Sequence, residues 1–191
     1  MKAQHKFLHG MGVAALGTVM VLSAQAPATA AAAGTYQVCR GVTVDRTAPV
    51  VSRASVLVKA PLVEVWRLHA DIDNWRSWIP EITPAHKKTP GPLRPGSVFT
   101  WSPQNMDVES TIKTIAPLRC TAWAAPVNGI SGVHLWTFKQ TKDGVLATTE
   151  ESWAGPPVEA DVPGNQAALD QGLGDWAHRL KDTAEARSDR H

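Results

Sequence analysis

The sequence predicts an α+β fold in which a curved antiparallel sheet packs against a long C-terminal helix. Three observations predict it: alternating segments joined by short links, two short helical segments after the first strand, and a helical stripe that closes the chain. Strands joined by short links pair in antiparallel order, whereas parallel strands need long crossovers. One helix, about 10–12 Å wide, cannot fill the concave face of a wide sheet. We therefore expect a cavity between helix and sheet.

Residues 1–30 have the layout of a secretory signal peptide. Lys2 and Lys6 precede a largely apolar run over residues 7–22, and small-residue A-x-A patterns follow. The run is shorter than a membrane span requires, which favours a cleaved signal over the alternative, an uncleaved anchor. We expect a secreted or extracytoplasmic protein with no stable membrane insertion after cleavage.

The charge balance argues against a nucleic-acid partner. The 191 residues carry a formal net charge of +2, and removal of Lys2 and Lys6 brings it to zero. The only basic cluster in the remaining chain is Lys87-Lys88, so a nucleic-acid-binding surface is not expected. The sequence does not indicate an oligomeric state.

Residues 31–51 form an N-terminal arm without clear periodicity. The arm contains Cys39, and the second cysteine, Cys120, falls in a predicted strand. In an exported chain the two could form one disulfide that ties the arm to that strand. The alternative is two separate buried thiols.

The first elements of the domain are a strand and two short helices. Residues 52–59 alternate between apolar and polar side chains, which predicts the strand. A helix follows with Pro61 as its first residue, because proline suits that position. A second short helix carries Trp75 and Trp78, and Pro80 ends it. Two Trp three residues apart face the same way, and we interpret them as packing on the core.

A turn-rich connector from Lys87 to Pro95 leads into the remaining strands. Each strand shows alternation and is bounded by Pro, Gly or Asn. They are expected at 97–101, 107–115, 119–124 and in the two arms of a hairpin within 133–155.

The hairpin is marked by Asp143-Gly144, a strong turn signal. Two registers are possible, with either Gln140 or Lys142 opposite Val145. Both registers put the same side chains on one face, because side chains alternate along a strand. That face carries His134, Trp136, Phe138, Ala147, Thr149, Glu151 and Trp153.

A long helix runs from about Gly164 to the end of the chain. Its apolar stripe has helical spacing and consists of Leu169, Leu173, Trp176, Leu180 and Ala184. Gly172 and Gly174 weaken its middle by about 1 kcal/mol each relative to Ala.

His134 and Glu151 are the candidate catalytic residues. They share a face of the hairpin, where they lie opposite or diagonal to each other according to the register. A carboxylate beside an imidazole in a cavity of low dielectric constant can support general acid–base catalysis, as enolisation or loss of water would need. The alternative is a buried polar pair that only satisfies itself.

Aromatic residues supply most of the candidate ligand contacts. The chain has eight Trp but one Tyr, and an indole ring offers flat apolar area together with one hydrogen-bond donor. Each Trp taken singly is equally consistent with core packing. The predicted ligand-binding residues are Phe99, Trp101, Ser110, Trp123, Trp136, Thr149, Trp153, Leu173 and Trp176.

No motif in the sequence indicates a metal or a cofactor. His69, His86, His134 and His178 are scattered and show no H-x-x-x-H spacing, and the chain has no C-x-x-C, phosphate-binding loop, dinucleotide fingerprint or G-x-S-x-G elbow. We therefore expect no metal and no cofactor, and proton transfer is the chemistry that has candidate residues.

From Ser52 to Glu185 the chain resembles the SRPBCC superfamily of START and Bet v 1-like helix-grip proteins, particularly its polyketide cyclase/dehydrase-like members. The motifs that carry the resemblance are Ala60-Pro61, the stretch 71–80, Pro95-Gly96, Ser110-Thr-Ile112, His134-Leu-Trp136, Glu150-Glu-Ser-Trp153-Ala-Gly155 and 176–181. The resemblance implies a helix-grip domain over residues 52–187, with seven antiparallel strands wrapped around the C-terminal helix and an internal cavity for an apolar ligand.

The residues and the resemblance together predict an exported protein that binds a hydrophobic or aromatic small molecule, lipid or polyketide-like, between the sheet and the C-terminal helix. The alternative is a polyketide cyclase or aromatase-type enzyme with His134 and Glu151 as its acid–base pair. A third possibility is a secreted interaction module whose cavity is incidental. Fold membership alone does not decide among them.

Overall fold

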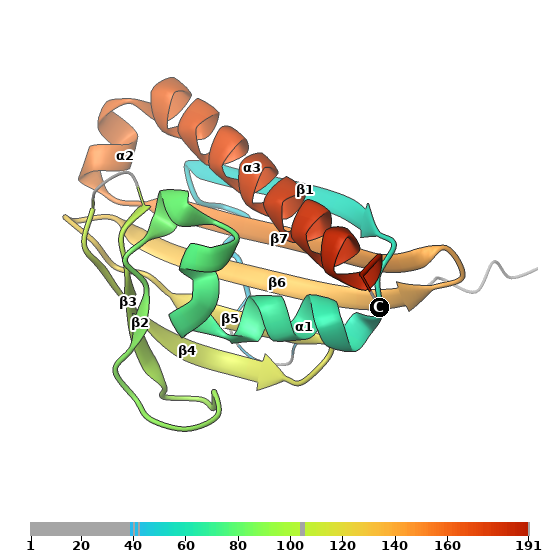
Figure 1. Ribbon diagram of the computed structural model, residues 1–191. Helices are drawn as coiled ribbons and strands as arrows, with labels where there is room; N and C mark the ends of the chain where they lie inside the picture. Colours follow the sequence, from blue (N-terminus) through green and yellow to red (C-terminus); the bar gives the residue numbers. More distant parts are fainter. Residues whose placement is uncertain (1–38, 40, 42, 104–105, 191) are drawn as a thin grey trace, which may run out of the picture. The chain divides into compact units, whose positions relative to one another are not determined.

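A computed structural model of the protein describes residues 39, 41, 43–103 and 106–190. The predicted signal peptide lies outside the described residues. So do residues 31–38, 40 and 42 of the predicted arm. Figure 1 shows the described elements with their labels. No helix among them has the length and hydropathy needed to span a membrane.

The described strands form one seven-stranded sheet in which all neighbours are antiparallel. The order is β1-β7-β6-β5-β4-β3-β2, so the last strand returns beside the first and the others follow their order in the chain. The predicted α+β helix-grip architecture is thereby confirmed. The strands are β1 (Val50–Val58), β2 (His86–Lys87), β3 (Val98–Trp101), β4 (Val108–Ala116), β5 (Cys120–Ala124), β6 (Ser131–Thr141) and β7 (Gly144–Ala154).

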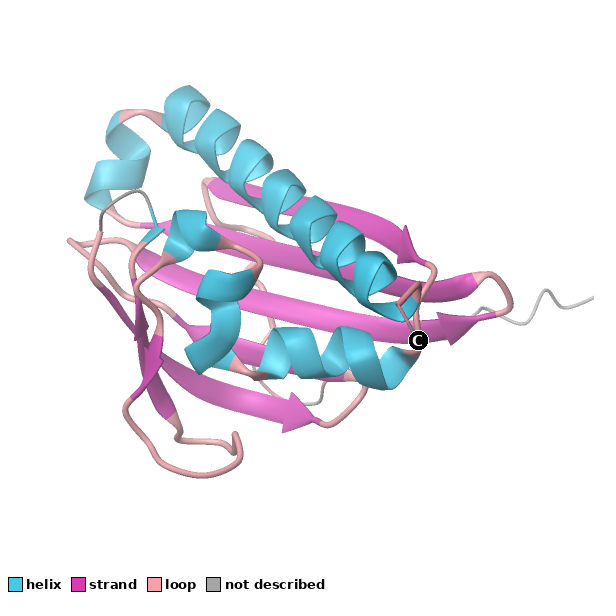
Figure 2. Cartoon of the chain, viewed as in Figure 1, coloured by secondary structure: helices cyan, strands magenta, loops and turns pink. Residues whose placement is uncertain are grey.

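Helices cover one face of this sheet (Figure 2). The long α3 (Val162–Ser188) packs mainly on β1 and also contacts β7 and α1 (Leu62–Ala70). The 3-10 helices η1 (Ile72–Ser77) and η2 (Pro80–Ile82) continue from α1, and the short α2 (Pro156–Ala160) joins β7 to α3. The face under these helices is called the inner face below.

The β6–β7 hairpin adopts one of the two predicted registers. Gln140 pairs with Val145 and Thr141 with Gly144, which leaves Lys142 and Asp143 at the tip. Because pairing continues without a bulge, His134 lies directly opposite Glu151 on the inner face.

Several element boundaries differ from the sequence prediction. β1 begins at Val50, two residues early, and the connector prediction missed β2, which is too short to show alternation. Pro80 begins η2 instead of only ending a helix, and α2 occupies the stretch after β7 where no element was predicted. α3 begins at Val162 because the Asp161 carboxylate accepts a hydrogen bond from the Gly164 N–H at 3.0 Å and caps the helix.

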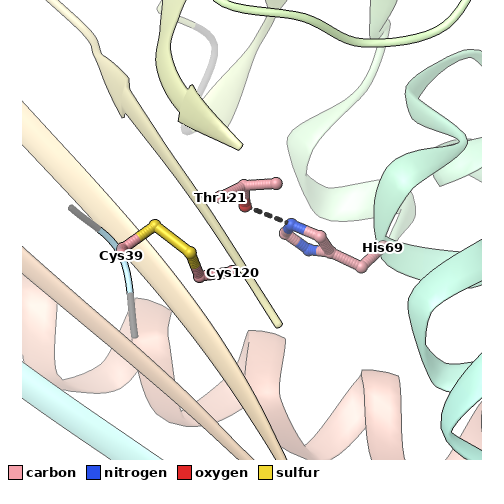
Figure 3. The surroundings of a disulfide bond; sticks show 4 residues. All are labelled: Cys39, His69, Cys120 and Thr121. Carbon is pink, nitrogen blue, oxygen red and sulfur yellow. Dashed lines mark hydrogen bonds between the residues drawn. A yellow bond between two sulfur atoms is a disulfide. The ribbon is translucent and has the colours of Figure 1, made fainter. Parts of the chain in front are cut away.

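The described part of the arm is linked to the outer face of the sheet, the face opposite the helices. Cys39 and Cys120 form a disulfide with Cα atoms 5.9 Å apart, which decides between the two alternatives left open by the sequence (Figure 3). Val44 packs on the same side against Ala122 and Leu135 and is buried. The arm thus covers part of the face that the helices leave bare.

Candidate functional site

The His134–Glu151 pair is buried in the middle of the hairpin. The imidazole Nδ1 lies 3.1 Å from Glu151 Oε2, and the two side chains are 0% and 5% exposed. The His134 Nδ1 makes no well-aligned hydrogen bond, so the two groups are in close contact without one. Close placement was predicted from the alternation of the strands, and the structure brings the two residues together.

Further contacts fix both side chains. His134 Nε2 lies 2.7 Å from Thr149 Oγ1, and the Trp153 indole N–H donates to Glu151 Oε1 at 2.9 Å. His134 Nε2 and the Thr149 hydroxyl share one hydrogen bond, and the ring tautomer decides which of them donates. Glu151 is therefore held from two sides by β6 and β7.

A pocket with two adjoining lobes lies between α3 and the sheet, where the sequence predicted a cavity. The lobes have volumes of about 140 and 80 Å³. Glu151 lines both lobes, and it is the only ionisable side chain among the described residues that line them. The residues common to both lobes are Trp101, Pro103, Met106, Glu151, Trp153 and Ala168.

The pocket gathers about half of the predicted site residues. Leu173 and Trp176 of α3 line the smaller lobe, in addition to Trp101, Trp153 and Glu151. His134 does not line either lobe, so the structure places it behind Glu151. The other predicted ligand contacts, namely Phe99, Ser110, Trp123, Trp136 and Thr149, also lie outside the pocket lining.

These remaining residues build the core instead. Trp123 packs against Trp75, Phe99 and His134 in tilted and edge-to-face contacts, with ring centroids 4.4 to 6.3 Å apart. Ser110 accepts the Trp101 indole N–H at 2.9 Å. The cavity expected from the width of the sheet is mostly filled, because indole rings and the helices α1 and η1 occupy the space that α3 leaves.

His69 of α1 is a buried titratable residue that was not among the predicted site residues. This residue is 2% exposed, and its Nε2 lies 2.6 Å from Thr121 Oγ1 (Figure 3). Burial, followed by the nearby His134, lowers the pKa of His69 from 6.5 to about 3. The signal was its position on the apolar side of α1, one helical turn after Val65.

Four buried indole N–H groups have no hydrogen-bond partner among the described residues. They belong to Trp78, Trp123, Trp136 and Trp176. Unpaired buried donors are uncommon, and Trp176 is the one that lines the smaller lobe. The Trp176 ring lines this lobe, and its Nε1 atom is itself buried.

A larger groove of about 710 Å³ lies elsewhere, between α1, η1 and the loops after β2 and β4. It is open, and its lining includes charged residues, of which Arg187 and Glu64 form an ion pair at 3.6 Å. No pattern in the sequence predicted this groove. No group of three or more His, Cys, Asp or Glu side chains in the described part of the chain is arranged to hold a metal ion.

Solved structures share the fold at low sequence identity. A hypothetical protein of Helicobacter pylori superposes with a TM-score of 0.61 and 18% identity, covering 71% of this chain and 86% of that one. DynU16, a putative protein of the dynemicin biosynthetic locus, has a TM-score of 0.58 and 20% identity, covering 72% of this chain and 48% of DynU16. The di-domain ARO/CYC StfQ of the steffimycin biosynthetic pathway has a TM-score of 0.56 and 14% identity, covering 73% of this chain and 52% of StfQ.

The chain therefore spans about half the length of DynU16 and of StfQ. At these identities the likeness shows the fold alone. No curated protein matches the sequence.

A family model described as "Polyketide cyclase / dehydrase and lipid transport" matches residues 49–185. The match includes all seven strands and nearly all of α3. The chain belongs to the polyketide cyclase/dehydrase and lipid transport family.

Proposed function

We propose that this protein binds a hydrophobic small molecule whose terminal group enters the pocket between α3 and the sheet. The observation that carries the proposal is the pocket lining, in which the aromatic side chains Trp101, Trp153 and Trp176 surround one fixed polar group, Glu151. Apolar pockets with few, well-placed polar groups are typical of ligand sites.

The volume of the pocket limits what can enter. An apolar cavity of about 150 Å³ holds a molecule the size of benzene, and drug-sized ligands need about 300 Å³ or more. The lobes of about 140 and 80 Å³ thus accept one ring or a short branched chain end. The rest of a lipid or polyketide-like ligand would lie outside the two lobes.

A titration with fluorobenzene, followed by the fluorine and Trp indole NMR signals, tests this binding. We expect saturable shifts of the Trp101, Trp153 and Trp176 indole signals. Ala168→Leu should weaken binding at least about tenfold, because Ala168 lines both lobes and the added carbons fill them.

Ala167→Leu is the matched control, because Ala167 is exposed on the same helix and lines neither lobe. NMR shifts confined to Trp66 and Trp78, which line the larger groove beside α1 and η1, would contradict the proposal. So would equal effects of the two alanine substitutions.

We also propose that the protein acts outside the cytoplasm. The N-terminal sequence has the layout of an export signal, and a disulfide such as Cys39–Cys120 persists in oxidising compartments. Intact-mass analysis of protein secreted by its host should give a chain that lacks about the first 30 residues and has no free thiol. A full-length chain retained in the cytosol would contradict export.

A second candidate function is acid–base catalysis of the cyclase or dehydratase type. This proposal is supported by the lining of the lobes, which includes Glu151, and by the contact of Glu151 with His134. Glu151 would be the catalytic residue, removing a proton from carbon next to a carbonyl, and His134 a positioning residue. Glu151→Gln should then abolish turnover of a small β-keto ester but leave fluorobenzene affinity intact. Unchanged turnover would exclude Glu151 as the base.

A further inference from the structure

The charge of the pocket is unusual for a site that binds apolar molecules. Glu151 supplies its only ionisable side chain among the described lining residues, so neither lobe offers a cation to an anionic ligand. A ligand that ends in a carboxylate, such as a fatty acid, would meet a second carboxylate in a desolvated space. Like charges in such a space repel strongly.

No basic side chain among the described residues lines the pocket beside Glu151. Arg46 and Arg53 pair with Glu150, its neighbour in sequence, which faces the opposite side of β7. His134 contacts Glu151 from the core and lines neither lobe. The Glu151 carboxylate is therefore the one ionisable group that the described lining residues present to the pocket.

The pocket walls favour a positive charge as well. Trp101, Trp153 and Trp176 line the smaller lobe together with Glu151, and the rings of Trp101 and Trp176 are 5.5 Å apart. The faces of indole rings attract cations, and groups of such rings recognise methylated ammonium ions. Trp153 also fixes the carboxylate through its indole N–H.

We propose that the pocket selects ligands with an organic ammonium group: a protonated amine or a quaternary ammonium seated between the indole rings and Glu151. This inference rests on the proposed binding function and names the chemical class of the group that enters. The compact lobes suit a methylated ammonium head, with an apolar remainder that extends beyond them. Burial of the carboxylate strengthens its attraction for the cation.

Three probes of nearly the same shape test the selection: choline, its neutral carbon analogue 3,3-dimethylbutan-1-ol, and the anion 3,3-dimethylbutanoate. Affinities are measured by NMR titration of the Trp indole signals at constant ionic strength. We expect choline to bind at least tenfold more tightly than the alcohol. The carboxylate should bind more weakly than either.

Glu151→Gln keeps the shape of the side chain and removes its charge, and it should reduce the preference for choline to less than about threefold. Glu150→Gln removes a charge from the adjacent residue on the outer face and should leave the preference unchanged. Thermal unfolding of each variant shows whether the fold is retained. If Glu151→Gln does not fold, Trp153→Leu at the half-buried rim keeps the charge and should lower choline affinity severalfold.

Equal or tighter binding of the alcohol or the carboxylate would overturn the inference, as would an unchanged preference in Glu151→Gln. Failure of choline to bind would overturn it too. The fluorobenzene titration reports separately on whether the pocket binds apolar molecules. Saturation by fluorobenzene without a preference for choline therefore rejects the ammonium ligand and retains the proposed function.

Discussion

Glu150 and Glu151 are neighbours in the sequence but have opposite environments. Glu150 faces outward and pairs with Arg46 and Arg53, whereas Glu151 faces inward to His134, Trp153 and the pocket. The alternation of side chains along β7 separates them completely. Glu150 thus pairs with Arg46 of the arm, whereas Glu151 is the ionisable group of the candidate site.

His69 provides a prediction about pH at the scale of a single residue. Its pKa is about 3 in the folded protein, against 6.5 for an unperturbed histidine, so the unfolded chain binds its proton first as the pH falls. Stability from His69 is complete above pH 6.5 and is lost between pH 6.5 and about 3, by up to about 1.4 kcal/mol per pH unit.

Urea unfolding of the wild type and His69→Leu between pH 7 and 4 measures this loss. The wild type should lose stability more steeply, and the difference in slope isolates His69 from the carboxyl groups. Parallel slopes for the wild type and His69→Leu would contradict the expected titration.

The site could be predicted from the sequence only in part. Strand alternation was enough to put Glu151 beside His134 on the inner face, because the two alternative registers agree on that face. Which aromatic residues line a pocket depends instead on how α1 and η1 pack, and no local pattern specifies it. Trp123 and Trp136 fill the core and Trp101 lines the pocket for this reason.

At the scale of elements, the tip of the β6–β7 hairpin depends on Gly144. Its φ of 138° is unfavourable for any residue with a side chain, and a Cβ there would lie 2.4 Å from the backbone oxygen of Val58. The hairpin tip and the end of β1 thus come together only with glycine at this position.

Gly144→Ala should therefore lower the free energy of unfolding by more than about 1 kcal/mol, from backbone strain and the contact with Val58 together. Gly96→Ala is the control, because Gly96 also has a positive φ, of 87°, but no atom lies within 4 Å of its added Cβ. Chemical denaturation should show a larger loss for Gly144→Ala. Equal losses would mean that the contact with Val58 is of no consequence.

Long elements were predictable and short ones were not. The alternation in β6 and β7 and the helical stripe of α3 extend over many residues, so the periodic signal is clear. β2 has two residues and forms because β3 offers a free edge, which is a tertiary effect. α2 occurs where two prolines suggested only the end of the sheet.

For the whole molecule, the Cys39–Cys120 disulfide closes a long loop, with a sequence separation of 81. Cross-links of this kind restrict the unfolded chain and contribute about 2–4 kcal/mol. Reduction with a thiol should lower the free energy of unfolding by that amount. A Cys39→Ser/Cys120→Ser variant should show the lower value already and should not respond to the thiol. Equal stability of oxidised and reduced protein would contradict this role.

The place where the arm is fastened decides how the domain responds to mechanical force. Without the disulfide, tension on the arm would reach β1, an edge strand, and could peel it from β7 one pair at a time. With the disulfide, tension that enters at Cys39 reaches β5, which has a partner strand on each side. The hydrogen bonds of two ladders then resist it together, and β1 is relieved of the load.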